Sequence, residues 1–125
     1  MLGPKHPATA GSLNDIARLL QDEGDLAGAR PLFERALAIW DKVLGTEHRD
    51  TNRGRRNFAT FLLASGDVSQ ALALGETALA AHEKVLGPTH PWTKDSARVT
   101  ADALVALNRG EEAATLRERF GLGTQ

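Results

Sequence analysis

LGPKHPAT at residues 2–9 recurs as LGTEHRDT at 44–51 and as LGPTHPWT at 86–93. Both offsets are 42 residues, from position 2 to 44 and from 44 to 86. A fixed period of this length is typical of a solenoid, in which each unit packs only against its neighbours. The period therefore predicts three consecutive units within one domain that spans residues 1–125. The units are expected at 2–43, 44–85 and 86–125.

Each unit is predicted to form two helices. The first helix begins near Pro7 and Pro91 in the outer units, because proline suits the first helical turn. It ends at Gly24, Gly66 or Asn108, since glycine and asparagine tolerate the left-handed conformation that ends a helix. Small residues recur where the two helices of a unit would cross, which allows a close approach. These residues pair as Ala17 with Ala29, Ala59 with Ala71, and Ala101 with Ala113.

The composition agrees with a folded helical domain and excludes several functions. The chain has 125 residues, 42% hydrophobic and only 5% aromatic, with no tyrosine. A net charge of −1 gives no general attraction to nucleic acid or to anionic membranes. Without cysteine there is no disulfide, thiolate metal site or cysteine nucleophile. No apolar run resembles a signal peptide or a membrane span, so a cytoplasmic protein is expected.

The motif LGPxHP, followed by SLNDIA at residues 12–17 and ALAI at 36–39, resembles the tetratricopeptide repeat in its 42-residue kinesin light chain-like variety. The resemblance implies an all-α, right-handed superhelical solenoid in which the first helix of each unit lines a concave groove. It also implies that this groove holds an extended peptide or a partner protein. Two departures stand out: Arg49 replaces the proline of the other units, and Gly75 stands where the first unit has Phe33.

Catalysis and metal binding are not expected. The repeated His6, His48 and His90 would lie a helix spacing or more apart, about 8–10 Å, whereas zinc ligands lie within roughly 2.1 Å of one ion. We expect these histidines to close the turn before each first helix. His82 is predicted to face solvent and Trp40 to be half-buried. The serines at 12, 65, 69 and 96 are predicted to cap helix ends, so no nucleophile–base pair, enzyme activity or cofactor is expected.

The repeat register places a set of polar residues on the groove side of the three first helices. Its arginines would form a positive strip that binds carboxylates through bidentate contacts. We therefore predict that the groove takes an acidic, extended peptide, with Asn14 holding a backbone amide. In the alternative interpretation the arginines pair with Asp15, Asp50, Asp95 and Asp102 or are simply solvated. RNA or DNA is a weaker candidate because stacking aromatics are scarce. The predicted groove residues are Asn14, Arg18, Gln21, Arg53, Arg56, Thr60, Arg98 and Asp102.

A second function is compatible with the same sequence. A solenoid exposes apolar surface at its ends unless polar units cap it, and the last helix carries Ala113, Ala114, Leu116 and Phe120. The chain would then be a structural self-assembly module, or a fragment of a longer array, whose ends mediate homo-oligomerisation. Trp92 is expected either to contact a ligand or to pack on the preceding loop.

Overall fold

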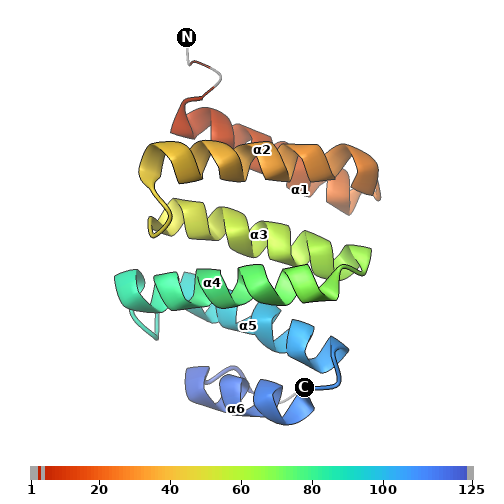
Figure 1. The fold of residues 1–125 in the computed structure, drawn as a ribbon, viewed down its shortest axis with the longest axis vertical. Coiled ribbons are helices and arrows are strands. Elements are labelled where there is room, and N and C mark those ends of the chain that lie inside the picture. Colours follow the sequence, from red (N-terminus) through yellow and green to blue (C-terminus); the bar gives the residue numbers. More distant parts are fainter. Residues whose placement is uncertain (1–2, 4, 124–125) are drawn as a thin grey trace.

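The computed structural model describes residues 3 and 5–123, and they form a stack of helix pairs (Figure 1). Leu2, Pro4 and the last two residues, which belong to the expected first and third units, lie outside the described residues. Within the described part the predicted pairs are confirmed, and no strand is present. The helices are α1 (Pro7–Asp22), α2 (Leu26–Leu44), α3 (Arg49–Ser65), α4 (Val68–Leu86), α5 (Pro91–Ala106) and α6 (Gly110–Phe120).

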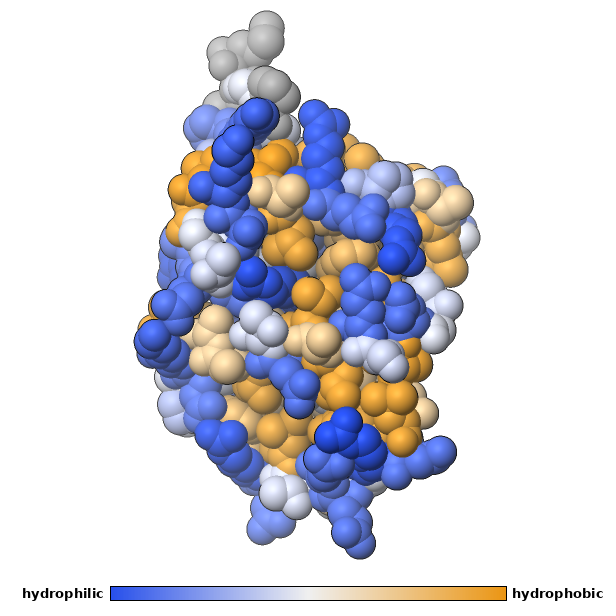
Figure 2. All heavy atoms as spheres, viewed as in Figure 1, coloured by the Kyte–Doolittle hydropathy of each residue, from blue (hydrophilic) through white to orange (hydrophobic). Residues whose placement is uncertain are grey.

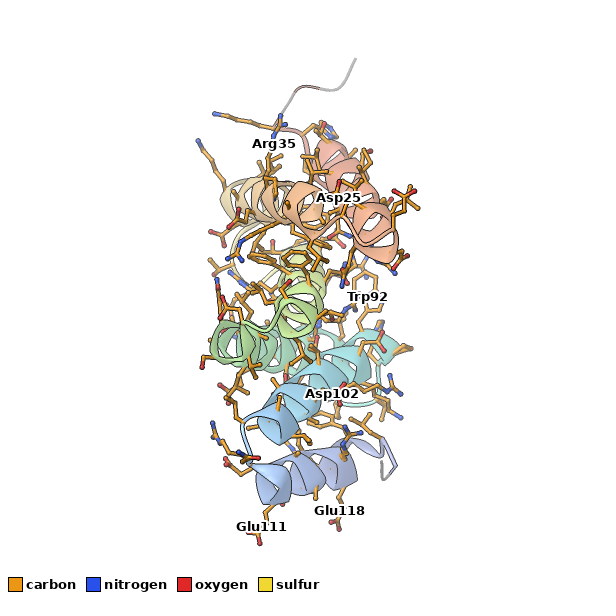
Figure 3. All side chains as sticks on the ribbon, turned by 90° about the vertical axis from the view of Figure 1, so that its right-hand side faces the viewer. Asp25, Arg35, Trp92, Asp102, Glu111 and Glu118 are labelled. Carbon is orange, nitrogen blue, oxygen red and sulfur yellow. The ribbon has the colours of Figure 1, made fainter. Side chains whose placement is uncertain are left out.

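The helices form two layers. Among the first helices, α3 contacts both α1 and α5 along one side, while α2 and α4 lie in front of α1 and α5 in Figure 1. Figure 2 shows this front face, on which hydrophobic surface remains visible between hydrophilic side chains. In the side view of Figure 3, Trp92 and Asp102 lie on the side of α1 and α5. The two layers therefore give the molecule two different faces, one built on first helices and one on second helices.

The repeated histidines cap the first helices, which explains their recurrence. In His6, His48 and His90 the ring Nδ1 accepts a hydrogen bond at 3.0 Å from the backbone N–H two residues further on. This bond satisfies one of the amide groups that the start of a helix leaves without a partner. The expectation that they close the turn is confirmed.

Small residues hold the two helices of each unit close together. The predicted alanines at the crossings are all buried, with exposed fractions of 0% for Ala59 and Ala71 and 1% for Ala113. The first helix of the last unit ends as predicted, because Asn108 adopts a left-handed backbone with φ of 62°. The helix pair is thus encoded by its contact points and its ends.

The expectations for His82, Trp40 and most of the serines are wrong. His82 is completely buried, with its Nδ1 2.8 Å from Ser96 Oγ and its Nε2 3.0 Å from the carbonyl oxygen of Arg49. Trp40, its counterpart one repeat earlier, is 2% exposed. The serine hydroxyls at positions 12 and 65 bond to helix carbonyl groups four residues earlier, and neither these two serines nor Ser96 caps a helix end. His82, Trp40 and Ser96 are buried in the stack, where burial outweighs the ordinary preference of histidine and serine for the surface, whereas Ser12 and Ser65 are exposed.

Candidate functional site

A groove lies on the side of the first helices. Its volume is about 350 Å³, and side chains from α1, α3 and α5 line it. Residues on these helices reach it because positions three and four apart share one helix face. The lining residues are Arg18, Gln21, Arg56, Asn57, Thr60, Leu63, Asp95, Arg98, Val99 and Asp102.

Six of the eight predicted groove residues lie in this lining. They are Arg18, Gln21, Arg56, Thr60, Arg98 and Asp102. The predicted register therefore brings residues from three repeats to one surface, although they are up to 84 positions apart, from 18 to 102.

Asn14 does not reach the groove surface. Its side chain is buried, and its Oδ1 accepts a hydrogen bond of 3.3 Å from Asn57 Nδ2. The expected contact of Asn14 with a peptide backbone does not fit this geometry, because its amide oxygen already accepts the hydrogen bond that joins α1 to α3. Asn57, which sequence inspection missed, lies in the lining instead.

Arg53 is also displaced from the groove. Its guanidinium lies between two indole rings, 5.2 Å from the centroid of Trp40 and 5.2 Å from that of Trp92. Asp50 is the nearest carboxylate, at 4.0 Å. A cation between two aromatic faces stabilises packing, so Arg53 ties α2, α3 and α5 together rather than presenting its charge in the groove. Trp92 also packs beside His90 of the preceding loop, which was one of its two predicted roles, with ring centroids 5.9 Å apart.

Arg56 is the most unusual group in the groove. Its side chain is only 13% exposed, its Nη2 donates to Asn57 Oδ1 at 3.2 Å, and its Nη1 lies 3.8 Å from Asp95 Oδ2. Within the described residues, this buried Nη1 has no hydrogen-bond acceptor. Burial lowers the pKa of Arg56, and repulsion from Arg53 and Arg18 adds to this effect, while Asp95 opposes it. The groove therefore contains a buried cation whose hydrogen-bonding capacity is not fully used.

The remaining charges of the groove are partly paired. Arg98 lies 2.7 Å from Asp95, and Asp102 lies 2.6 Å from Arg117 of α6. Arg18 takes part in no ion pair among the described residues. The alternative in which aspartates neutralise the strip therefore applies only in part, since Asp95 is shared by two arginines and Asp102 is occupied from outside the groove.

The described residues offer neither a metal site nor a membrane-spanning helix. Among them no three His, Asp or Glu side chains gather where a metal ion would bind. None of the described helices is both long and apolar enough to cross a bilayer. The site with the most convergent polar groups is therefore the arginine-lined groove.

The geometry defines a class: an all-α solenoid of helix pairs whose first helices line a charged groove. Two family models described as tetratricopeptide repeat match residues 9–50 and 50–119, so the chain belongs to the tetratricopeptide repeat family. Repeats of this family generally mediate protein–protein interactions.

The fold is also found in solved structures. The chain is 31% identical, with a TM-score of 0.84, to the nearly identical TPR-like repeats of a kinesin light chain-like protein from Podosopora anserina. A glutamine-to-methionine variant of that protein gives the same identity and TM-score. Each match covers 92% of this chain but 55% and 54% of the solved chains, so this chain spans about half of their length. No curated protein gives a significant match.

Proposed function

We propose that this protein binds an extended, acidic segment of a partner protein in the groove formed by α1, α3 and α5. The observation that carries the proposal is the buried Nη1 of Arg56, which lacks a hydrogen-bond acceptor within the groove. A buried donor left without a partner costs free energy, and a shift of the guanidinium, whose side chain is 13% exposed, would bring it to a carboxylate oxygen of a ligand.

The neighbouring charges support the same ligand. Arg18 and Arg98 are exposed at the two sides of Arg56, and Gln21 and Thr60 add polar contacts between them. Arginine binds carboxylates with paired N–H groups, which favours aspartate and glutamate side chains over other acceptors. The lining has three arginines and two aspartates, and one of those aspartates, Asp102, is already paired with Arg117. The excess of positive charge also favours an anionic ligand.

Fluorescence anisotropy with a labelled peptide in which glutamate alternates with serine would test this proposal. We expect binding that weakens with salt, because exposed charges are screened over a Debye length of about 8–10 Å. The double variant Arg18→Glu with Arg98→Glu should weaken binding by roughly tenfold or more, since two attractions become repulsions.

The matched control is Arg35→Glu, which removes an exposed arginine on α2 outside the groove. It should leave the affinity for the acidic peptide unchanged. Equal affinity for a peptide with glutamine in place of glutamate would overturn the proposal.

A second candidate function rests on the outer face of α1. Ile16 and Leu19 are 48% and 59% exposed, whereas their counterparts one repeat later, Phe58 and Phe61, are 4% and 1% exposed. At the opposite end, a cleft of about 480 Å³ lies along α6, lined largely by small and apolar residues such as Val105 and Ala114. We propose that these two faces pack together between copies, repeating the contact that the repeats make within the chain.

Sedimentation velocity over a range of concentrations tests this self-association. We expect oligomers that the variant Ile16→Glu with Leu19→Glu reduces to monomers, because charges would replace the exposed apolar contact. A monomer at every concentration contradicts this second candidate.

A further inference from the structure

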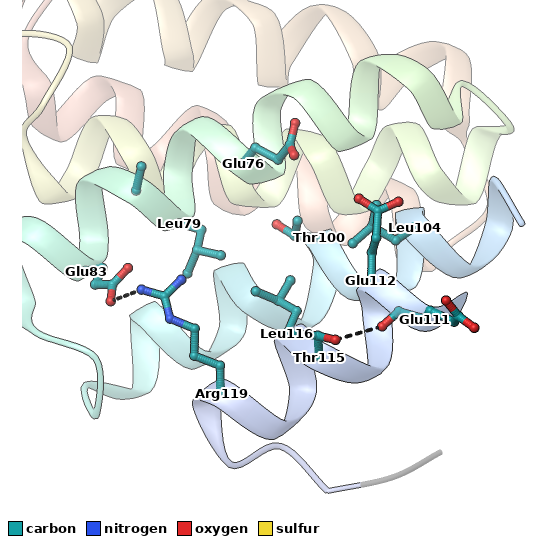
Figure 4. A pocket seen from close by; sticks show the side chains of 11 residues that line it. Glu76, Leu79, Glu83, Thr100, Leu104, Glu111, Glu112, Thr115, Leu116 and Arg119 are labelled. Carbon is teal, nitrogen blue, oxygen red and sulfur yellow. Dashed lines mark hydrogen bonds and ion pairs between the residues drawn. The ribbon is translucent and has the colours of Figure 1, made fainter. Parts of the chain in front are cut away.

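A second cleft lies on the opposite side of the molecule from the arginine-lined groove. It opens between α4 and α6 above α5 and has a volume of about 600 Å³ (Figure 4). Thr100 and Leu104 of α5 face this cleft, whereas Arg98 and Asp102 of the same helix face the groove. The lining residues are Glu76, Leu79, Ala80, Glu83, Thr100, Leu104, Glu111, Glu112, Thr115, Leu116 and Arg119.

The cleft occurs where large side chains have been replaced by small ones. At the junction of the first two repeats, Phe58 fills the position that corresponds to Thr100 and packs on Phe33 with ring centroids 6.1 Å apart. The counterpart of Phe33 is Gly75. Thr100 closes the space beside Gly75 and lies at the edge of the cleft, which the apolar side chains of Leu79 and Leu116 line further along (Figure 4). The cleft therefore has a floor of leucine side chains that are largely buried, with Leu79 7% and Leu104 5% exposed.

The rim of the cleft is acidic. Four glutamates and one arginine line it, and that arginine, Arg119, is held by Glu83 at 2.6 Å. Glu112 forms an ion pair with Arg109 at 2.6 Å. Arg109 is also attracted electrostatically by Glu76. Glu76 and Glu111 take part in no ion pair among the described residues.

The first junction shows how such carboxylates are neutralised elsewhere in this chain. There Glu34, the counterpart of Glu76, lies 3.6 Å from Arg30. The residue that corresponds to Arg30 in the second repeat is Leu72, which is buried. The second junction therefore lacks this arginine as well as the aromatic rings, and among the described residues Glu76 keeps only the longer-range attraction of Arg109.

From this combination we propose that the cleft binds a basic amphipathic segment of a partner protein. An apolar side chain of the segment would lie on Leu79, Leu104 and Leu116, and flanking lysine or arginine side chains would reach Glu76 and Glu111. Long cationic side chains suit this arrangement because their stems pack on apolar surface while their charges stay at the rim. A volume of about 600 Å³ falls within the range of sites that enclose a ligand group.

The partner is a separate protein rather than a second copy of this chain. The arginine-rich stretch of this chain lies in α3, where Arg55 is held by Asp41 at 3.1 Å and Arg53 lies between two tryptophans. These two side chains are committed within the fold, and the exposed Arg18 and Arg98 lie in the groove proposed for the acidic segment, so we assign the cations to a separate protein. The protein would then present opposite charges on its two faces, one for an acidic segment and one for a basic segment.

A labelled synthetic helix-forming peptide with leucine on one face and lysine on the other serves as the probe, with binding followed by anisotropy. We expect the double variant Glu76→Gln with Glu111→Gln to weaken binding by roughly tenfold, since it removes both unpaired carboxylates. Ala80→Trp, at an exposed position of the lining, should block binding by filling the cleft. The matched control Glu34→Gln, at the first junction, should bind like the unmodified protein.

The two proposals fail separately. Variants of the cleft should bind the acidic peptide normally, and the groove variant Arg18→Glu with Arg98→Glu should bind the basic peptide normally. Unchanged binding in both cleft variants would overturn this inference. A change in sedimentation caused by Glu76→Gln with Glu111→Gln would also overturn it, because a second copy would then be the occupant.

Discussion

The two junctions between successive repeats use the same positions of the 42-residue unit but different side chains. The first junction, between α2 and α3, contains Phe33, Phe58 and Phe61, with ring centroids 5.3 to 6.1 Å apart. The second junction, between α4 and α5, has glycine, threonine and alanine in their places. Those counterparts are Gly75, Thr100 and Ala103.

A second pair of positions differs in the same coordinated way. Trp40 of the first junction faces Gly54, where an added Cβ would lie 2.8 Å from the indole. In the second junction the counterparts are His82 and Ser96, and the smaller ring leaves room for a side chain that hydrogen-bonds to it at 2.8 Å. From the first junction to the second, one residue of the pair becomes smaller and the other larger, so the contact stays filled.

One backbone arrangement therefore supports two kinds of junction. The aromatic junction is filled by rings, whereas the small-residue junction brings α4 and α5 into close contact at Gly75 and leaves a cleft beside it. Because repeats stack mainly through nearest-neighbour contacts, each junction can be weakened or altered on its own.

The largest effect is expected when an aromatic ring is removed from the first junction. Phe61 is 1% exposed, and Phe61→Ala should lower the free energy of unfolding by about 3–5 kcal/mol through lost burial and a residual cavity. Urea denaturation followed by circular dichroism measures this loss. The matched change Ala103→Gly, at the counterpart in the second junction, should cost only about 1 kcal/mol, the ordinary helix penalty of glycine. Similar losses for the two variants would show that the rings do not distinguish the junctions.

A smaller effect is expected from adding one methyl group to the second junction. In Gly75→Ala the new Cβ would lie 2.7 Å from Thr100 Oγ1, which overpacks the contact at a cost of about 1–3 kcal/mol. Thr100 cannot simply rotate away, because its hydroxyl donates to the carbonyl oxygen of Ser96 at 2.7 Å.

Adding Thr100→Ala to the same chain should recover most of that loss, since the next nearest atom is the Cα of Thr100 at an ordinary 3.4 Å. A double-mutant cycle by urea denaturation measures the coupling between the two sites. Additive effects would mean that α4 and α5 are not in close contact at this point.

Much of the fold could be predicted from sequence because the period, the helix ends and the small crossing residues are local or periodic signals. His6, His48 and His90 recur every 42 positions, so their common role at the helix start was predictable. The burial of His82 was not predicted because histidine does not recur at the equivalent position of the first repeat. Its register with Trp40, a large aromatic on the same helix face, was the signal that indicated burial.

The sequence predicted which helix face each groove residue lies on, but not how deeply its side chain is buried. Arg18, Arg56 and Arg98 lie in its lining, as the register required. The depth of a side chain depends on its neighbours in three dimensions, and periodicity does not supply those. Asn14 is covered because Asn57 reaches across to it, and Arg53 is withdrawn because two tryptophans from other repeats lie on either side of it.

The smallest expected effect is a pH dependence that only the second junction has. Burial lowers the pKa of His82, repulsion from Arg56 and His90 adds to this, and hydrogen bonds to the backbone of Arg49 and Trp92 oppose it. Because the folded pKa lies below the unfolded one, the unfolded chain takes up the proton first as the pH falls. The contribution of His82 to stability is therefore complete above its ordinary pKa of about 6.5 and is lost progressively below it.

We therefore expect the free energy of unfolding, measured by urea denaturation, to decline from about pH 7.5 to pH 5, on either side of that ordinary value. The decline should be shallower in His82→Gln than in the unmodified protein. Glutamine keeps one donor and one acceptor for Arg49 and Ser96 but does not titrate, and the other histidines are present in both proteins. Trp40 holds the equivalent place in the first junction without a titratable group, so the decline should be accompanied by loosening of α4 from α5 alone. Amide hydrogen exchange would locate it there, and equal loss of protection at both junctions would remove the distinction between them.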